Sequence, residues 1–228
     1  KAVADLLDRH KGKILFIGSP YASMESNYAL RQLAARMGVK DVYFVTHEQP
    51  GWGDKLLRED DRTPNKAGCL LLGFKPLTAQ QAQEEARKHS LTYLIEDDAV
   101  ASQLVQAGVA LIAHAYQYFD GHANAEVLLP AATNVEAAGV YVNSKKVPQM
   151  TMQARQIKQM TPEMWMAMPK SRLDAGGVAV DNWRHPENIV DCMPSWMLVS
   201  LVGQEGGHGG SHTTHKDVFT KLQQEFDV

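Results

Sequence analysis

The chain has 228 residues, of which 44% are hydrophobic and 21% are charged, and its formal net charge is −3. This composition is ordinary for a globular protein and excludes a disordered chain. The charge provides no basic field for nucleic acid or anionic lipid, and no apolar run approaches the ~20 residues of a membrane span. We therefore expect a cytoplasmic protein with no nucleic-acid partner and no direct membrane span. Because the chain begins at Lys1 rather than methionine, we also expect it to be a fragment of a longer protein.

Strands and helices alternate over the first 130 residues. Short apolar runs predict strands at residues 14–17, 42–45, 70–72, 91–95 and 110–113. Between the first two strands, Tyr28, Leu33, Ala34 and Met37 form a helical stripe that ends at Gly38. Residues 49–65 contain glycine, proline and many charges, which predicts a long loop or excursion.

Two later helices have recognisable starts. Thr78 and Gln81 have the spacing of a capping box, which predicts a helix through about His89. Residues 99–107 form a second helix that Asp97 or Asp98 is expected to cap. The alternation predicts a doubly wound α/β fold, with a mostly parallel sheet and helices on both faces.

Residues 127–129 form a further apolar run that stops at Pro130, which supplies no ladder donor. We expect an interior strand buried on both faces. It leads into an irregular polar stretch whose Gly139 permits close backbone approach. We place an α/β domain at residues 1–150.

Residues 151–228 are expected to form an irregular and helical extension packed on that domain. A methionine-rich segment comes first, and Met160, Met164, Trp165 and Met168 share one face of a predicted helix that we expect to pack internally. The last helix is predicted at residues 214–226, with Thr214 as a possible cap. One of its faces carries Val218, Phe219, Leu222 and Phe226.

The order Leu-Pro-Ala-Ala-Thr at residues 129–133, followed by Glu136, Gly139, Asn143 and Gln149, resembles the late segment of the molybdopterin oxidoreductase superfamily. Within it, the chain most resembles the molybdopterin-oxidoreductase-like region found in the large peripheral subunits of NADH-quinone oxidoreductase, respiratory complex I. Residues 26–30 and 68–73 are similar to a helix and a strand of that family. The resemblance implies vestigial cofactor-binding positions at Thr133, Glu136, Gly139, Asn143 and Gln149.

This resemblance also implies a scaffold lobe that acts with other subunits of a respiratory oxidoreductase complex, peripheral to the inner membrane. Iron–sulfur clusters would lie elsewhere in the full-length protein, because Cys69 and Cys192 are too few for a typical cluster. Where the family commonly has a Glu-Gly-Arg stretch, this chain has Lys145, Lys146 and Val147. We therefore expect no catalysis and no cofactor in this fragment.

Three alternatives remain open. The chain would be part of an active, formate dehydrogenase-like enzyme if the loop at residues 143–149 contributed to a molybdopterin site. The turn Gly18-Ser19-Pro20 lies between a strand and a helix, as in a nucleotide-binding module, although no G-x-G-x-x-G follows. Three histidines of the Gly-rich C-terminal stretch could meet a zinc or copper ion, but glycines on both sides of His208 argue against a regular site, and we expect no dedicated metal site. These histidines are His208, His212 and His215.

Overall fold

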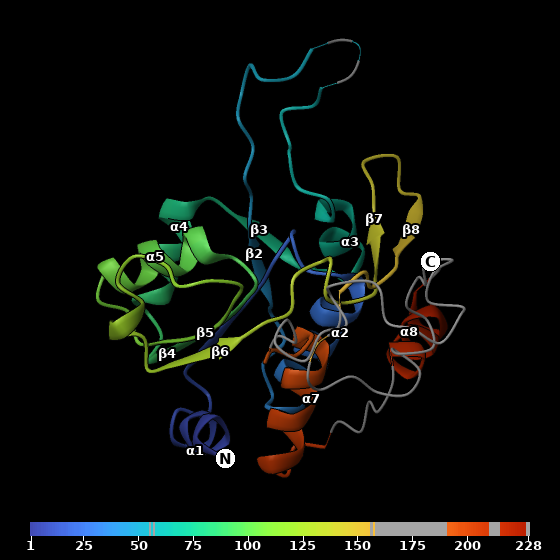
Figure 1. Cartoon of the computed structure of the whole chain (residues 1–228). Coiled ribbons are helices and arrows are strands. Elements are labelled where there is room, and N and C mark those ends of the chain that lie inside the picture. The colour runs from blue at the N-terminus through green and yellow to red at the C-terminus, as the bar shows by residue number, and fades with distance from the viewer. Residues whose placement is uncertain (55, 57, 156, 158–190, 210–214, 227–228) are drawn as a thin grey trace.

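A six-stranded parallel sheet is the centre of the molecule in the computed structural model, which describes residues 1–54, 56, 58–155, 157, 191–209 and 215–226. The strand order is β3-β2-β1-β4-β5-β6, so the chain leaves β1 toward one edge and later returns to build the other. The predicted α/β fold with a parallel sheet is confirmed (Figure 1). The strands are β1 (Ile14–Gly18), β2 (Tyr43–Val45), β3 (Lys75–Leu77), β4 (Leu91–Ile95), β5 (Leu111–Ala115) and β6 (Val127–Pro130).

Helices cover both faces of this sheet because its central strands are apolar on both sides. In β1, Phe16 faces one core and Leu15 and Ile17 face the other. The first core is completed by α1 (Ala2–Arg9), α2 (Met24–Arg36), α7 (Ser195–Glu205) and α8 (His215–Glu225), and the second by α4 (Ala79–Ala86) and α5 (Asp98–Gln106).

The local signals for helix starts and ends are confirmed. Gln81 N donates to Thr78 Oγ1 at 3.2 Å and Thr78 N donates to Gln81 Oε1 at 2.9 Å, which completes the capping box of α4. Asp97 caps α5, since Val100 N donates to its Oδ1 at 3.2 Å. Gly38 follows α2 with φ = +79°. Both partners of each interaction lie within a few residues of each other, so a short stretch of sequence is enough to predict it.

The predicted strand at residues 70–72 is wrong, and so is the strand inferred by resemblance at residues 68–73. This segment is helix α3 (Lys66–Leu71), whose turns close through bonds such as Cys69 N to Asn65 O at 3.0 Å. Gly73 has φ = +76°, a left-handed conformation that ends the helix. The third strand begins only at Lys75. A short apolar run does not separate a buried strand from a buried helix.

The strand at residues 127–130 exists, but its predicted interior position is wrong. Among the strands that the structure describes, β6 pairs with β5 alone and forms the edge of the sheet, while Met193 N donates to Pro130 O at its end. Val127, Leu128 and Leu129 are each half-buried rather than buried. Pro130 is compatible with this position because an edge strand does not need a complete set of donors.

A hairpin of β7 (Gly139–Val142) and β8 (Pro148–Thr151) lies outside the main sheet and packs against α2 and α3. Beyond it, α7 and α8 pack on α2, with Val218 and Leu222 of α8 fully buried. The predicted final helix and its apolar face are therefore confirmed. A domain boundary at residue 150 stays a prediction. Thr214, Met160, Met164, Trp165 and Met168 lie outside the described residues.

The segment 46–65 is here called the arm. Its described residues leave the body between β2 and α3 and project well beyond the sheet (Figure 1). The two limbs of the arm meet at an antiparallel bridge between Glu48 and Asp61. Asn65 anchors the C-terminal end of the arm to the body of the molecule, since Asn65 N donates to Pro20 O at 2.9 Å. The predicted excursion is therefore confirmed.

Candidate functional site

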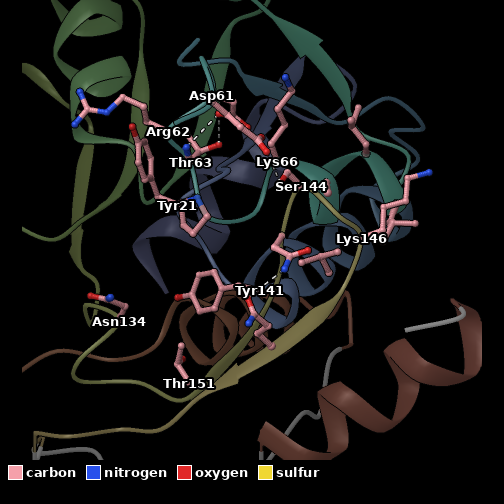
Figure 2. A pocket seen from close by; sticks show the side chains of 18 of the residues that line it. Tyr21, Asp61, Arg62, Thr63, Lys66, Asn134, Tyr141, Ser144, Lys146 and Thr151 are labelled. Carbon is pink, nitrogen blue, oxygen red and sulfur yellow. Dashed lines mark hydrogen bonds between the residues drawn. The ribbon is translucent and has the colours of Figure 1, made fainter. Parts of the chain in front are cut away.

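A cavity of about 1150 Å³ opens beyond the carboxyl ends of the strands, where parallel α/β sheets usually bind their ligands. Its walls come from the base of the arm, from α3, from the β7–β8 hairpin and from the loop at residues 133–134. Figure 2 shows Tyr21, Asp61 and Arg62 on one side of this space and Tyr141 and Lys146 on the hairpin side. Segments distant in sequence therefore create the cavity jointly.

Aromatic and charged side chains dominate the lining. Three tyrosines contribute rings and hydroxyl groups, and they are Tyr21, Tyr116 and Tyr141. The charged side chains are Glu59, Asp61, Arg62, Lys66 and Lys146. Lys66 forms an ion pair with Glu48. Ser144 Oγ donates to Glu59 Oε1 at 2.9 Å, and this hydrogen bond joins the tip of the hairpin to the arm. The lining offers polar and aromatic contacts with a mixed charge.

Three of the five positions expected from the resemblance line this cavity. They are Thr133, Asn143 and Gln149, whereas Glu136 and Gly139 are buried behind the wall. The tertiary structure thus brings the first three together and separates the other two from the open space.

Glu136 is only 6% exposed and organises the turn after β6. Both the backbone N and the Oγ1 of Thr133 donate to Glu136 Oε2 at 3.0 Å. Arg155 Nη1 lies 3.5 Å from the other carboxylate oxygen, Oε1. The carboxylate is therefore engaged by groups of the chain itself, so its arrangement fixes the course of the backbone into the hairpin.

Gly139 allows β7 to touch the start of α2. A Cβ atom at this position would lie 2.5 Å from Cβ of Ser23, closer than side chains tolerate. The next residue, Val140, donates its N–H to Glu25 Oε2 at 3.0 Å, and Glu25 is itself fully buried. Close packing between β7 and the start of α2 therefore explains why position 139 is a glycine.

Asn143 shapes the hairpin turn. Its Oδ1 accepts hydrogen bonds from Lys145 N at 3.0 Å and from Val147 N at 2.9 Å. Its Nδ2 lies 3.5 Å from Gln149 Oε1 across the hairpin. Lys146 adopts φ = +61° in this turn, and its side chain lines the cavity. The residues that depart from the family pattern therefore form the tip of the hairpin.

Sequence reasoning missed Asn65, which is fully buried between the arm and the hairpin. Asn65 Nδ2 donates to Ala22 O at 2.8 Å, and Asn65 Oδ1 accepts from Val142 N at 2.9 Å. One side chain thus links the loop after β1 to β7. An asparagine beside Pro64 resembles an ordinary turn residue, so no signal in the sequence points to this role.

A second pocket of about 530 Å³ lies beside the main cavity, and His47 lines it. His47 follows β2, and its Nε2 lies 2.6 Å from Oδ2 of Asp97, which follows β4. The ring of Tyr21 packs against the imidazole with centroids 5.0 Å apart. Burial opposes protonation of His47, but the carboxylates of Asp97 and Asp61 together outweigh burial, so the pKa of His47 is raised.

Glu96 is a buried carboxylate, 5% exposed, at the end of β4. Burial raises the pKa of Glu96, although the hydroxyl groups of Ser195, Tyr116 and Ser26 oppose this rise. Its backbone adopts φ = +49° and its carbonyl accepts from Ser19 Oγ at 2.8 Å. The segment 96–98 therefore turns inward at Glu96 and caps α5 at Asp97.

The turn Gly18-Ser19-Pro20 is not open for a phosphate. Ser19 N donates to Asn27 Oδ1 at 3.0 Å, and Tyr21 N donates to Ser19 Oγ at 3.0 Å. A Cβ atom on Gly18 would lie 2.3 Å from the ring of Phe74, so the turn is filled by its own neighbours. The N–H groups of Ser19 and Tyr21 are therefore engaged within the chain.

Among the described residues, no group of three or more His, Cys, Asp or Glu side chains could hold a metal ion. His208 Nε2 lies 3.0 Å from Asp8 Oδ1. His212 and the side chain of His215 lie outside the described part of the chain. Cys69 is buried in α3, as is typical of a small apolar residue. Cys192 is also buried, and its Sγ lies 3.9 Å from Glu136 Oε2.

Comparison with known proteins adds one relative. No protein-family model matches the chain. Over 165 residues the chain is 25% identical to the NADH-ubiquinone oxidoreductase 78 kDa subunit, mitochondrial, of Candida albicans. The similar region covers 72% of this chain and 21% of that subunit, so the chain spans about a fifth of the relative's length. This weak similarity agrees with the resemblance to a NADH-quinone oxidoreductase subunit.

The helices that the structure describes include none that is both long and apolar enough to cross a membrane.

Proposed function

We propose that this chain is part of a NADH-quinone oxidoreductase subunit and serves there as a structural lobe that binds no molybdopterin. Respiratory electron transfer from NADH to quinone would proceed through clusters elsewhere in the complex. The similarity to the 78 kDa subunit, over 72% of this chain, supports the assignment to such a complex. On this proposal the lobe is peripheral to the membrane and acts through contacts with other subunits.

The observation that carries the cofactor-free role is the internal use of the family-like side chains. Glu136 accepts two hydrogen bonds from Thr133, and Asn143 Oδ1 accepts two from backbone N–H groups of the hairpin turn. Glu136 is buried and Asn143 is half-buried, and in both residues these hydrogen bonds hold the backbone of the chain itself. These internal hydrogen bonds are sufficient to explain why a glutamate occurs at position 136 and an asparagine at position 143.

The lining also fits a molybdenum centre poorly. Thiolates are the protein ligands that suit soft metals, yet neither Cys69 nor Cys192 lines the cavity. The hairpin tip places Lys146 in the lining, within the stretch where the family commonly has Glu-Gly-Arg.

Elemental analysis and pterin fluorescence test this proposal. The full-length protein is purified from its native cells in the complex, and the same preparation is analysed for molybdenum, tungsten and oxidised pterin. We expect the chain to co-purify with NADH dehydrogenase activity and to contain none of the three at stoichiometric amounts. Stoichiometric metal and pterin would overturn the cofactor-free role, and absence from the NADH dehydrogenase fraction would overturn the assignment to the complex.

One observation favours the second candidate, an active molybdopterin oxidoreductase. The cavity is large enough for an extended ligand, and Thr133, Asn143 and Gln149 all line it. The elemental analysis described above decides between the two functions. A formate dehydrogenase-like activity in the same preparation would support this second candidate.

A further inference from the structure

The arm contributes little to the folded core, because its outer part extends away from both faces of the sheet (Figure 1). Its limbs pair through Gln49 N and Asp60 O at 2.9 Å, close to the bridge between Glu48 and Asp61. A protruding segment loses conformational entropy on ordering without burying its own apolar surface. Such a segment is typical of a docking element.

The outer half of the arm is organised by carboxylates. Asp54 Oδ1 accepts hydrogen bonds from Leu56 N at 2.8 Å and Arg58 N at 3.0 Å, while its Oδ2 pairs with Arg58 Nε at 3.0 Å. Asp60 Oδ1 accepts from Gly53 N at 2.7 Å. These bonds pre-order the exposed end, which lowers the entropy that binding would cost.

Large apolar groups are exposed at this end. Trp52 is 42% exposed, and the guanidinium groups of Arg58 and Arg62 lie over its ring at 5.3 Å and 4.7 Å from the centroid. Leu56 is 88% exposed and belongs to no core cluster of the described residues. Tryptophan and arginine are the residue types that most often dominate binding at protein interfaces.

The charge of the arm indicates the kind of partner. Residues 48–62 contain five acidic and three basic residues, which gives a net charge of −2. An acidic element is repelled by nucleic acid and by anionic lipid, and it is attracted to a basic protein surface. The acidic residues are Glu48, Asp54, Glu59, Asp60 and Asp61, and the basic ones are Lys55, Arg58 and Arg62.

We propose that the arm docks, through Trp52 and Leu56, into an apolar socket with a basic rim on a neighbouring polypeptide of the same complex. This inference rests on the proposed function, because it requires the complex. The apolar socket accepts the exposed leucine and one edge of the indole, and the basic rim complements the acidic arm. Docking of the arm would also fix the wall of the adjacent cavity, since the base of the arm forms part of it.

Leu56→Ser tests the arm with little risk to the fold, because this side chain is almost entirely exposed. The matched control is Leu201→Ser, which removes a leucine that is 41% exposed on α7. Both variants are expressed as the full-length subunit, and their unfolding in urea is compared with that of the wild type. We then measure the amount of subunit in the fraction with NADH dehydrogenase activity.

We expect Leu56→Ser to lower this amount at least about tenfold, as for truncation of a central interface residue, and Leu201→Ser to leave it unchanged. If the wild-type subunit is absent from the fraction, the proposed function and the docking inference both fall. If the wild type is present and Leu56→Ser is equally abundant, the docking inference alone is overturned.

Photo-crosslinking identifies the surface. A photoreactive benzoylphenylalanine in place of Leu56, in the assembled complex, should cross-link to another polypeptide at a site surrounded by lysine and arginine. Cross-links only within this chain, no cross-link, or a cross-link to an acidic surface would each contradict the inference.

Discussion

His47 Nε2 and Asp97 Oδ2 lie 2.6 Å apart and connect the ends of two strands that are not neighbours in the sheet. His47 follows β2 and Asp97 follows β4, while β1 runs between those strands. Asp97 also caps α5 through its other oxygen, Oδ1. The pair therefore couples the protonation of a histidine to the packing of the carboxyl edge of the sheet.

This pairing predicts a pH dependence of stability. The pKa of His47 is raised by Asp97 and Asp61 despite burial, so the folded state favours the imidazolium more than the unfolded state does. The resulting stabilisation is fully present below the ordinary histidine pKa of about 6.5 and is lost as the pH rises through the higher folded pKa. In urea unfolding at several pH values, the stability advantage of the wild type over His47→Gln should decrease toward alkaline pH. A constant difference would contradict this coupling.

Asn65 is expected to be critical for the junction of the arm and the hairpin. Asn65→Ala removes hydrogen bonds to Ala22 O and Val142 N and leaves buried backbone groups unpaired, at a cost of about 2–4 kcal/mol in the free energy of unfolding. Asn134→Ala, at an exposed position, serves as the control and should change this free energy by less than about 0.5 kcal/mol. Equal effects of the two substitutions in urea unfolding would show that Asn65 has no special role.

Gly139→Ala should destabilise the fold by about 1–3 kcal/mol, because the added methyl group meets Ser23 Cβ. Ser23→Gly removes that atom and costs only a few tenths of a kcal/mol as a helix cap. A double-mutant cycle measured by chemical unfolding should therefore show that Gly139→Ala is less damaging in the Ser23→Gly background. Additive effects would place the cause of the glycine requirement elsewhere.

Two substitutions distinguish the interior of the sheet from its edge. Leu94→Asp places a charge at a fully buried position of β4 and should cost at least about 3 kcal/mol. Leu128→Asp, in the half-buried edge strand β6, should cost clearly less because the carboxylate can reach water. The two melting temperatures, measured side by side, check this order, and a greater loss for Leu128→Asp would contradict the edge position of β6.

The sequence predicted the elements whose interactions lie within a few residues, and it failed where distant segments decide. The spacing of Thr78 and Gln81 predicts the capping box, and the position before the helix predicts a cap at Asp97 or Asp98, of which Asp97 is the one observed. The apolar run at residues 70–72 predicts a strand but overlaps the end of the helix Lys66–Leu71. So short a run does not establish a period. In the candidate site, Thr133, Asn143 and Gln149 line the cavity, but Glu136 and Gly139 lie behind its wall.

By itself, then, the sequence determined the α/β alternation, since buried parallel strands and amphipathic helices leave distinct periodic patterns in the chain. Only the tertiary structure decided the edge position of β6 and the roles of Glu25 and Asn65, which bond residues 115 and 77 positions away. The physical reason is that strand order and long-range hydrogen bonds depend on which surfaces meet when the chain packs. Such contacts leave no local periodicity or spacing from which the sequence alone could predict them.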